Sequence, residues 1–125
     1  MDENTITLDK LEDDIPVVVV EGEHDIYTAP TLRERIYALV GDGSGGMVVD
    51  LTPATFIDSS VLGVLLGARR RAHEAGQGFA VCCGADTDPG VVRILEVTGL
   101  IPVLPVVGDR AAAAQTVKDG PSESQ

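Results

Sequence analysis

The chain has 125 residues, a formal net charge of −11 and a sequence pI near 4.3. This charge opposes binding to nucleic acid phosphates and to anionic membrane surfaces, so we expect neither as a partner. Hydrophobic residues make up 44% of the chain and aromatic residues only 3%, which indicates one domain with a core of Val, Leu, Ile and Ala.

Several other classes of protein are disfavoured by the sequence. No apolar run reaches the roughly 18 residues of a membrane span, and the acidic start at Met1–Asn4 lacks the basic region of a signal peptide, so we expect a cytoplasmic protein. Cys82 and Cys83 are adjacent and would point to opposite faces of a strand, which disfavours a bridge between them. With these two cysteines and two histidines, we expect no metal site.

The first half of the chain begins with a predicted hairpin. A weak edge strand over 5–8 and a strand dense in β-branched residues over 15–22 are joined by a short acidic turn, so they should pair antiparallel. A helix is expected to begin at Thr28, with a proline two residues later, and to end at Gly41. The glycine-rich 41–46 lacks the lysine of a phosphate-binding loop and precedes a strand, so it is interpreted as a flexible linker.

Strands and helices alternate through the second half. We expect strands over 47–51, 78–84 and 103–107, and helices over 59–75, 89–98 and 109–117. This order predicts an α/β fold with a mixed, mostly parallel sheet of four to five strands covered by about four helices. A single domain is expected over 1–117, followed by a disordered polar tail over 118–125.

The helix after the strand over 47–51 carries the most informative residues. Ser59 lies where its hydroxyl can cap the first free amides of the helix, and Asp58 is expected just outside, near the positive end of the helix dipole. A phosphate also suits a helix N-terminus and adds a charge of about −1.5 to −2. Ser59 is therefore a structural cap, a regulated hydroxyl, or both.

A serine hydrolase would need a base within hydrogen-bond reach of Ser59. His73 lies fourteen residues further along the same helix, which is roughly 21 Å at 1.5 Å per residue. His24 could approach from another loop, but the Gly-x-Ser-x-Gly turn of such enzymes is missing. A small serine hydrolase is thus the least favoured function, and we do not expect an enzyme.

Three separated motifs resemble the STAS domains of anti-sigma factor antagonists. They lie at 22–33 (Gly-Glu-His-Asp followed by Thr-Ala and Leu-Arg), at 48–63 (a strand followed by Asp-Ser-Ser), and at 92–100 (a helix ending in Val-Thr-Gly-Leu). Their order and spacing agree over roughly residues 5–118. The resemblance implies a STAS fold and a partner-switching antagonist.

The resemblance also implies how the switch would operate. The unmodified protein would bind an anti-sigma factor of the serine kinase type, and phosphorylation of Ser59 by that kinase would release it. A phosphatase would restore the unmodified form. Nucleotide would belong to the kinase, so no cofactor is expected in this protein. The protein itself is expected to be a monomer or weak dimer. The residues expected to contact the partner are His24, Asp25, Tyr27, Thr28, Asp58, Ser59, Ser60, Val61, Leu62 and Gly63.

Two residues depart from the family pattern. His24 replaces an apolar residue on what is expected to be an exposed loop, and Val61 replaces a glycine whose missing side chain would let a kinase approach closely. Asp25 either caps the turn before the first helix or takes part in the switch. Because of Val61, a STAS module that acts as a scaffold or small-ligand sensor without a phosphoswitch remains the alternative function.

Overall fold

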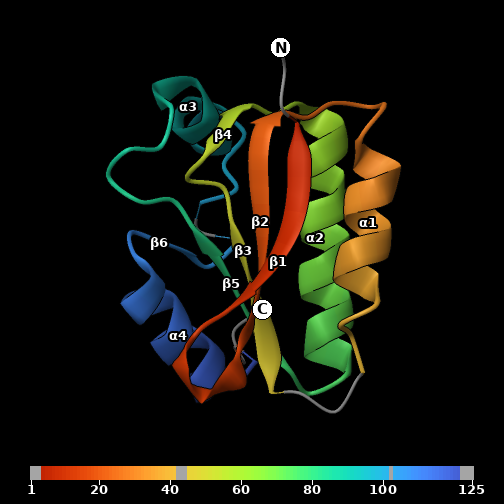
Figure 1. Cartoon of the computed structure of the whole chain (residues 1–125), viewed down its shortest axis with the longest axis vertical. Helices are drawn as coiled ribbons and strands as arrows, with labels where there is room; N and C mark the ends of the chain where they lie inside the picture. Colours follow the sequence, from red (N-terminus) through yellow and green to blue (C-terminus); the bar gives the residue numbers. More distant parts are fainter. Residues whose placement is uncertain (1–3, 42–44, 102, 122–125) are drawn as a thin grey trace.

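The computed structural model describes residues 4–41, 45–101 and 103–121 (Figure 1). Its strands are β1 (Thr5–Lys10), β2 (Pro16–Glu23), β3 (Gly46–Asp50), β4 (Ala54–Phe56), β5 (Gly78–Cys82) and β6 (Val106–Val107). Its helices are α1 (Ala29–Tyr37), α2 (Ser59–Glu74), α3 (Pro89–Val97) and α4 (Arg110–Asp119), with a short 3-10 turn at Glu12–Asp14.

The strands form one mixed sheet in the order β1-β2-β3-β5-β6. β1 is antiparallel to β2, and the other neighbours run parallel, as the alternation of strands and helices predicts. The sixth strand, β4, pairs with the end of β2 beyond β3, at a register shift between Gly22 and Glu23. The sheet therefore has one strand more than expected, because the turn after β3 returns the chain to β2.

Alternate residues of the strands build two apolar layers. Val18, Val49 and Val81 belong to the larger cluster, which packs against the apolar faces of α1 and α2. Val17 and Val48, which are their neighbours along the strands, belong to a second cluster under α4. Figure 1 shows α1 and α2 on one side of the sheet and α4 on the other, with α3 beside β4. The period-two pattern of the strands thus explains the three layers.

Helix α4 is held closely against the sheet. A Cβ atom at Gly78 would lie 2.2 Å from the carbonyl oxygen of Val117, so only glycine allows this approach. At its other end, Arg110 forms ion pairs at 3.0 Å with Asp9 on β1 and with the buried Asp50 at the end of β3. These contacts tie three segments that are far apart in the sequence.

Several expected boundaries shift. The last strand is limited to Val106–Val107, and α4 continues to Asp119, two residues beyond the expected end. The expected linker over 41–46 and the expected tail over 118–125 fall partly outside the described residues. Within the described residues, no helix has the length and apolar character needed to cross a membrane.

The two adjacent cysteines form no disulfide and differ in burial. Cys82 is buried and Cys83 half-buried, and both are free thiols. Burial raises the pKa of the Cys83 thiol to about 12. No group of three metal-ligating side chains gathers in the part of the chain that the structure describes.

Candidate functional site

Helix α2 is capped by Asp58 rather than by Ser59. The backbone of Asp58 is extended, and its Oδ1 atom accepts hydrogen bonds from the backbone N–H groups of Ser60 at 2.9 Å and Val61 at 3.3 Å. The expected placement of Asp58 outside the cap was wrong by one residue. Both residue types are good caps, and the carboxylate also complements the positive end of the helix dipole.

Ser59 is consequently the first residue of the helix. Its side chain is exposed, and within the described residues its hydroxyl has no hydrogen-bond partner. The helix start therefore does not depend on this hydroxyl for a cap. A change to the Ser59 side chain can reach solvent or a partner without removing a contact of the fold.

The loop between β2 and α1 is organised around a buried histidine. His24 is only 1% exposed, so the expectation of an exposed loop position was wrong. Its Nε2 atom lies 2.8 Å from the carbonyl oxygen of Glu21, and its Nδ1 atom lies 3.0 Å from the hydroxyl oxygen of Thr28. A carbonyl only accepts, so Nε2 donates to Glu21, while the Thr28 hydroxyl is shared between Nδ1 and the carbonyl oxygen of Asp25, 3.3 Å away.

The rest of this loop is a tight turn into α1. The Asp25 Oδ1 atom accepts from the backbone N–H of Tyr27 at 2.9 Å, and the Thr28 hydroxyl oxygen accepts from the backbone N–H of Asp25 at 3.0 Å. The expected capping role of Asp25 in the turn before the first helix is confirmed by this contact. Thr28 precedes α1, as predicted, although its hydroxyl turns back into the loop instead of capping the helix.

The β2–α1 loop and the start of α2 are joined through β4. The backbone N–H of His24 donates to the carbonyl oxygen of Phe56 at 2.9 Å, two residues before the Asp58 cap. Three large apolar side chains are exposed along this connection: Ile26 at 62%, Tyr27 at 86% and Phe56 at 50%. Exposed apolar side chains therefore lie on the two segments, the β2–α1 loop and β4, that meet just before the start of α2.

This surface includes residues that the sequence motifs did not single out. Ile26 and Phe56 flank the predicted residues but are not part of the expected set. Ile26 also lines a hollow of about 320 Å³ between α1 and α2, together with Ser60 and Gly63. In the sequence, Ile26 and Phe56 could be recognised only as apolar residues between polar neighbours. Because β4 was not among the predicted elements, Phe56 was not expected on this surface.

The first turn of α2 divides its residues between core and surface. Val61 is completely buried and Leu62 is nearly so, whereas Gly63 is exposed. Val61 and Leu62 therefore support the site from beneath, although they were expected to contact a partner. The Val61 side chain points into the core, so it does not obstruct the approach to Ser59 as the sequence suggested.

A comparison with known proteins identifies the fold family. The family model for the STAS domain matches residues 8–113. The chain belongs to the STAS domain family. It is 32% identical over 98 residues to an anti-sigma F factor antagonist of Paenibacillus polymyxa, covering 78% of this chain and 81% of that protein. It is also 28% identical over 95 residues to an anti-sigma-B factor antagonist of Bacillus subtilis, covering 76% and 83%.

A solved structure agrees with this assignment. The crystal structure of an anti-sigma factor antagonist from Mycobacterium paratuberculosis superposes with a TM-score of 0.80 and 29% sequence identity. The match covers 94% of this chain and 96% of that one. The mixed sheet with its two unequal helical faces is thus the STAS fold.

Neither histidine of this STAS domain is placed to act as a base on Ser59. Both ring nitrogens of His24 are engaged, with the Glu21 carbonyl and the Thr28 hydroxyl. His73 lies in the last turn of α2, at the opposite end of the helix from Ser59. The geometry that nucleophilic activation of a serine requires is therefore not assembled from these two residues.

Proposed function

We propose that this protein is an anti-sigma factor antagonist that works by partner switching. In its unmodified form it binds an anti-sigma factor of the serine kinase type and so frees the sigma factor. Phosphorylation of Ser59 by that kinase dissolves the complex, and a phosphatase resets it. The protein acts as a binding module in the cytoplasm, with no catalysis and no cofactor of its own.

The observation that carries this proposal is the exposed hydroxyl of Ser59, which has no hydrogen-bond partner among the described residues and lies beside a cap that Asp58 already supplies. A kinase can reach such a hydroxyl without unfolding the helix. The exposed side chains of Ile26, Tyr27 and Phe56 offer apolar area around it, as the centre of a protein interface requires. The relatives named as anti-sigma factor antagonists support the choice of partner.

The electrostatics favour release after phosphorylation. A phosphate adds a charge of about −1.5 to −2 next to Asp58, on a protein that already carries −11. The dipole of α2 offsets only about 0.3–1 kcal/mol of the resulting repulsion. Like charges brought together in a contact made for a neutral hydroxyl cost several kcal/mol, so the complex weakens much more than the fold does.

The test combines phosphorylation and binding with a panel of candidate anti-sigma factor kinases. Purified protein is incubated with each kinase and ATP, and any added phosphate is located by peptide mass spectrometry. We expect phosphate on Ser59 and loss of co-elution with the kinase. The Ser59→Ala variant should bind but resist modification.

A charge-matched pair of variants separates the site from general charge effects. Ser59→Asp should weaken kinase binding at least tenfold in calorimetry, while Ala111→Glu, on the exposed side of α4 across the sheet, should leave it unchanged. Equal affinity for Ser59→Asp and the unmodified protein would refute the electrostatic switch. Co-elution without phosphate would indicate a constitutive antagonist, and neither result with any kinase would favour the scaffold or sensor.

A further inference from the structure

The charges of this acidic protein are distributed unevenly over its surface. Helices α1 and α2 carry five arginines and two glutamates, a formal charge of +3. The rest of the chain carries four basic and eighteen acidic side chains, a formal charge of −14. These two helices lie together on one side of the sheet (Figure 1), so the positive charge is confined to one face.

Some basic side chains on this face already have partners. Arg35 donates to the carbonyl oxygen of Ile6 at 2.7 Å, and the Arg71 guanidinium stacks 4.6 Å from the ring centroid of Tyr37. Within the described residues, the ion pairs involve Arg110 and Lys118 instead. None of the five arginines of this face therefore has an acidic partner in the described chain, and Arg33, Arg69 and Arg70 have neither a hydrogen bond nor a ring contact there.

These arginines line a continuous furrow along α2. Arg69, Arg70 and His73 border a hollow of about 570 Å³ whose floor is formed by Gly63, Leu66 and Gly67. Arg33 borders the neighbouring hollow of about 320 Å³, which shares Gly63 with the first. We call the two hollows together the arginine furrow. A Cβ atom added at Gly63 would meet nothing within 4 Å, so the furrow is open where the hollows join.

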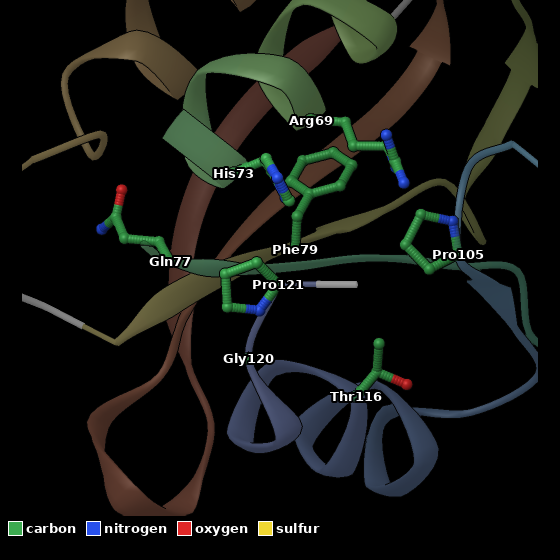
Figure 2. Close-up of a pocket in the computed structure, with 8 residues that line it drawn as sticks. All are labelled: Arg69, His73, Gln77, Phe79, Pro105, Thr116, Gly120 and Pro121. Atoms are coloured by element: carbon green, nitrogen blue, oxygen red, sulfur yellow. The ribbon is translucent and has the colours of Figure 1, made fainter. Parts of the chain in front are cut away.

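One end of the arginine furrow is held in place by the sheet. Figure 2 shows Arg69 and His73 reaching from α2 to either side of the Phe79 ring on β5. The pocket that these residues line with Phe79 has a volume of only about 50 Å³, which is room for one or two water molecules. This pocket is too small for a ligand, but the Phe79 ring packs between the two side chains at this end of the furrow.

We propose that the arginine furrow is a docking surface for a short acidic segment of a partner protein. From Gly63 to His73 the furrow extends about 15 Å along the helix, a length that a few extended or helical residues span. Half-buried Leu66 adds an apolar contact between the charges. The hollow of about 320 Å³ in this furrow is also lined by Ser60, which follows Ser59 directly, so one partner can occupy both surfaces.

Charge explains why a protein segment fits better than nucleic acid. A DNA duplex carries phosphates on both strands and would bring some of them against the remaining surface, which carries −14. A second copy of this chain would have to bring its own acidic surface to the furrow, in a head-to-tail contact that does not close. A short acidic segment meets the positive strip alone.

The test is a titration of the full-length ¹⁵N-labelled protein with a blocked decaglutamate peptide, followed by NMR. We expect saturable shifts of amides at 63–73 and at Arg33, and at least tenfold weaker binding in 0.5 M salt, because exposed charges are then screened within a few ångströms. The double variant Arg69→Gln/Arg70→Gln should bind at least tenfold more weakly. Arg93→Gln, on the exposed side of α3, is the matched control and should change the affinity less than twofold.

Several results would overturn the proposal. Shifts spread over the whole surface, or equal affinity of the double variant and the control, would mean that the furrow is not a site. Tighter binding of a ten-base-pair DNA than of decaglutamate would assign the furrow to nucleic acid. Shifts of the same amides on dilution of the free protein would assign it to a second copy. No anti-sigma factor is present in this titration, so its outcome is independent of the proposed function.

Discussion

Replacing Asp58 by alanine should destabilise helix α2, whereas replacing Ser59 by alanine should leave the stability of the fold nearly unchanged. In Asp58→Ala, the backbone N–H groups of Ser60 and Val61 lose the carboxylate oxygen that lies 2.9 and 3.3 Å away. Loss of such a cap costs about 0.5–2 kcal/mol, which includes the favourable charge at the helix N-terminus. Ser59→Ala removes no hydrogen bond within the described residues, so its effect should stay within about 0.5 kcal/mol.

Urea unfolding monitored by circular dichroism measures both changes. For a small domain, a loss of about 1 kcal/mol lowers the urea midpoint by roughly 0.3–1 M at an unchanged slope. Asp58→Asn keeps an oxygen acceptor but loses the charge, so its stability should fall between those of the wild-type protein and Asp58→Ala. If Ser59→Ala lowers the midpoint as much as Asp58→Ala does, the serine hydroxyl is the cap and the separation argued above is wrong.

Three further predictions concern other parts of the fold. The hydrogen bond from the Arg110 guanidinium is the main cause of the lowered pKa of Asp9, whose ordinary value is 3.8. The stability that this pair contributes is therefore complete above that value and is lost as the pH falls through the lowered pKa. The difference in the free energy of unfolding between wild type and Arg110→Gln, measured in urea, should therefore shrink from pH 7 to pH 2.5. Because burial raises the pKa of the Cys83 thiol to about 12, iodoacetamide should modify it slowly at pH 8 in the folded protein and rapidly in urea; equal rates would contradict its burial. Val61→Gly should lower the free energy of unfolding by about 2–4 kcal/mol, because apolar burial is lost and backbone freedom is added. Gly63→Ala should leave the free energy of unfolding unchanged or raise it. Similar urea midpoints for the two variants would refute the buried position of Val61.

The sequence was sufficient to predict the layers of the fold. A run of β-branched residues marked β2, apolar runs marked β3 and β5, and apolar residues at helical spacing marked α1 and α2. The short strand β4 could not be predicted in this way, because its three residues are too few to establish a period. It exists through a nonlocal contact, the pairing of Ala54 and Phe56 with the shifted register at the end of β2.

Two expectations about the candidate site, the cap of α2 and the exposure of His24, were wrong for physical reasons. Asp58 and Ser59 are both favoured at a helix cap, so residue type alone cannot decide which of them precedes the first turn. His24 looks like a surface residue because an imidazole is polar. It can be buried because a carbonyl three residues before it and a hydroxyl four residues after it satisfy both ring nitrogens.

The position of the Val61 side chain in the fold changes the interpretation of this residue. In the sequence it lies among residues that resemble a kinase-contacting motif, so its bulk counted against phosphorylation. In the fold its side chain is 0% exposed and packs under the helix, where it adds apolar contact and removes the backbone freedom of a glycine. The feature that favoured a sensor without a phosphoswitch thus belongs to the core.

In the switch proposed above, the first turn of α2 divides structural and switching roles between different residues. Asp58 holds the helix start through its carboxylate, Val61 anchors the turn in the core, and Ser59 between them has no contact that the fold needs. A phosphate on Ser59 would add repulsion with Asp58, but the helix dipole offsets part of it and water screens the remainder while the site is exposed. In a complex the same charge is desolvated and unscreened. The free energy of phosphorylation is therefore expressed at the interface rather than in the fold, which is what a reversible partner switch requires.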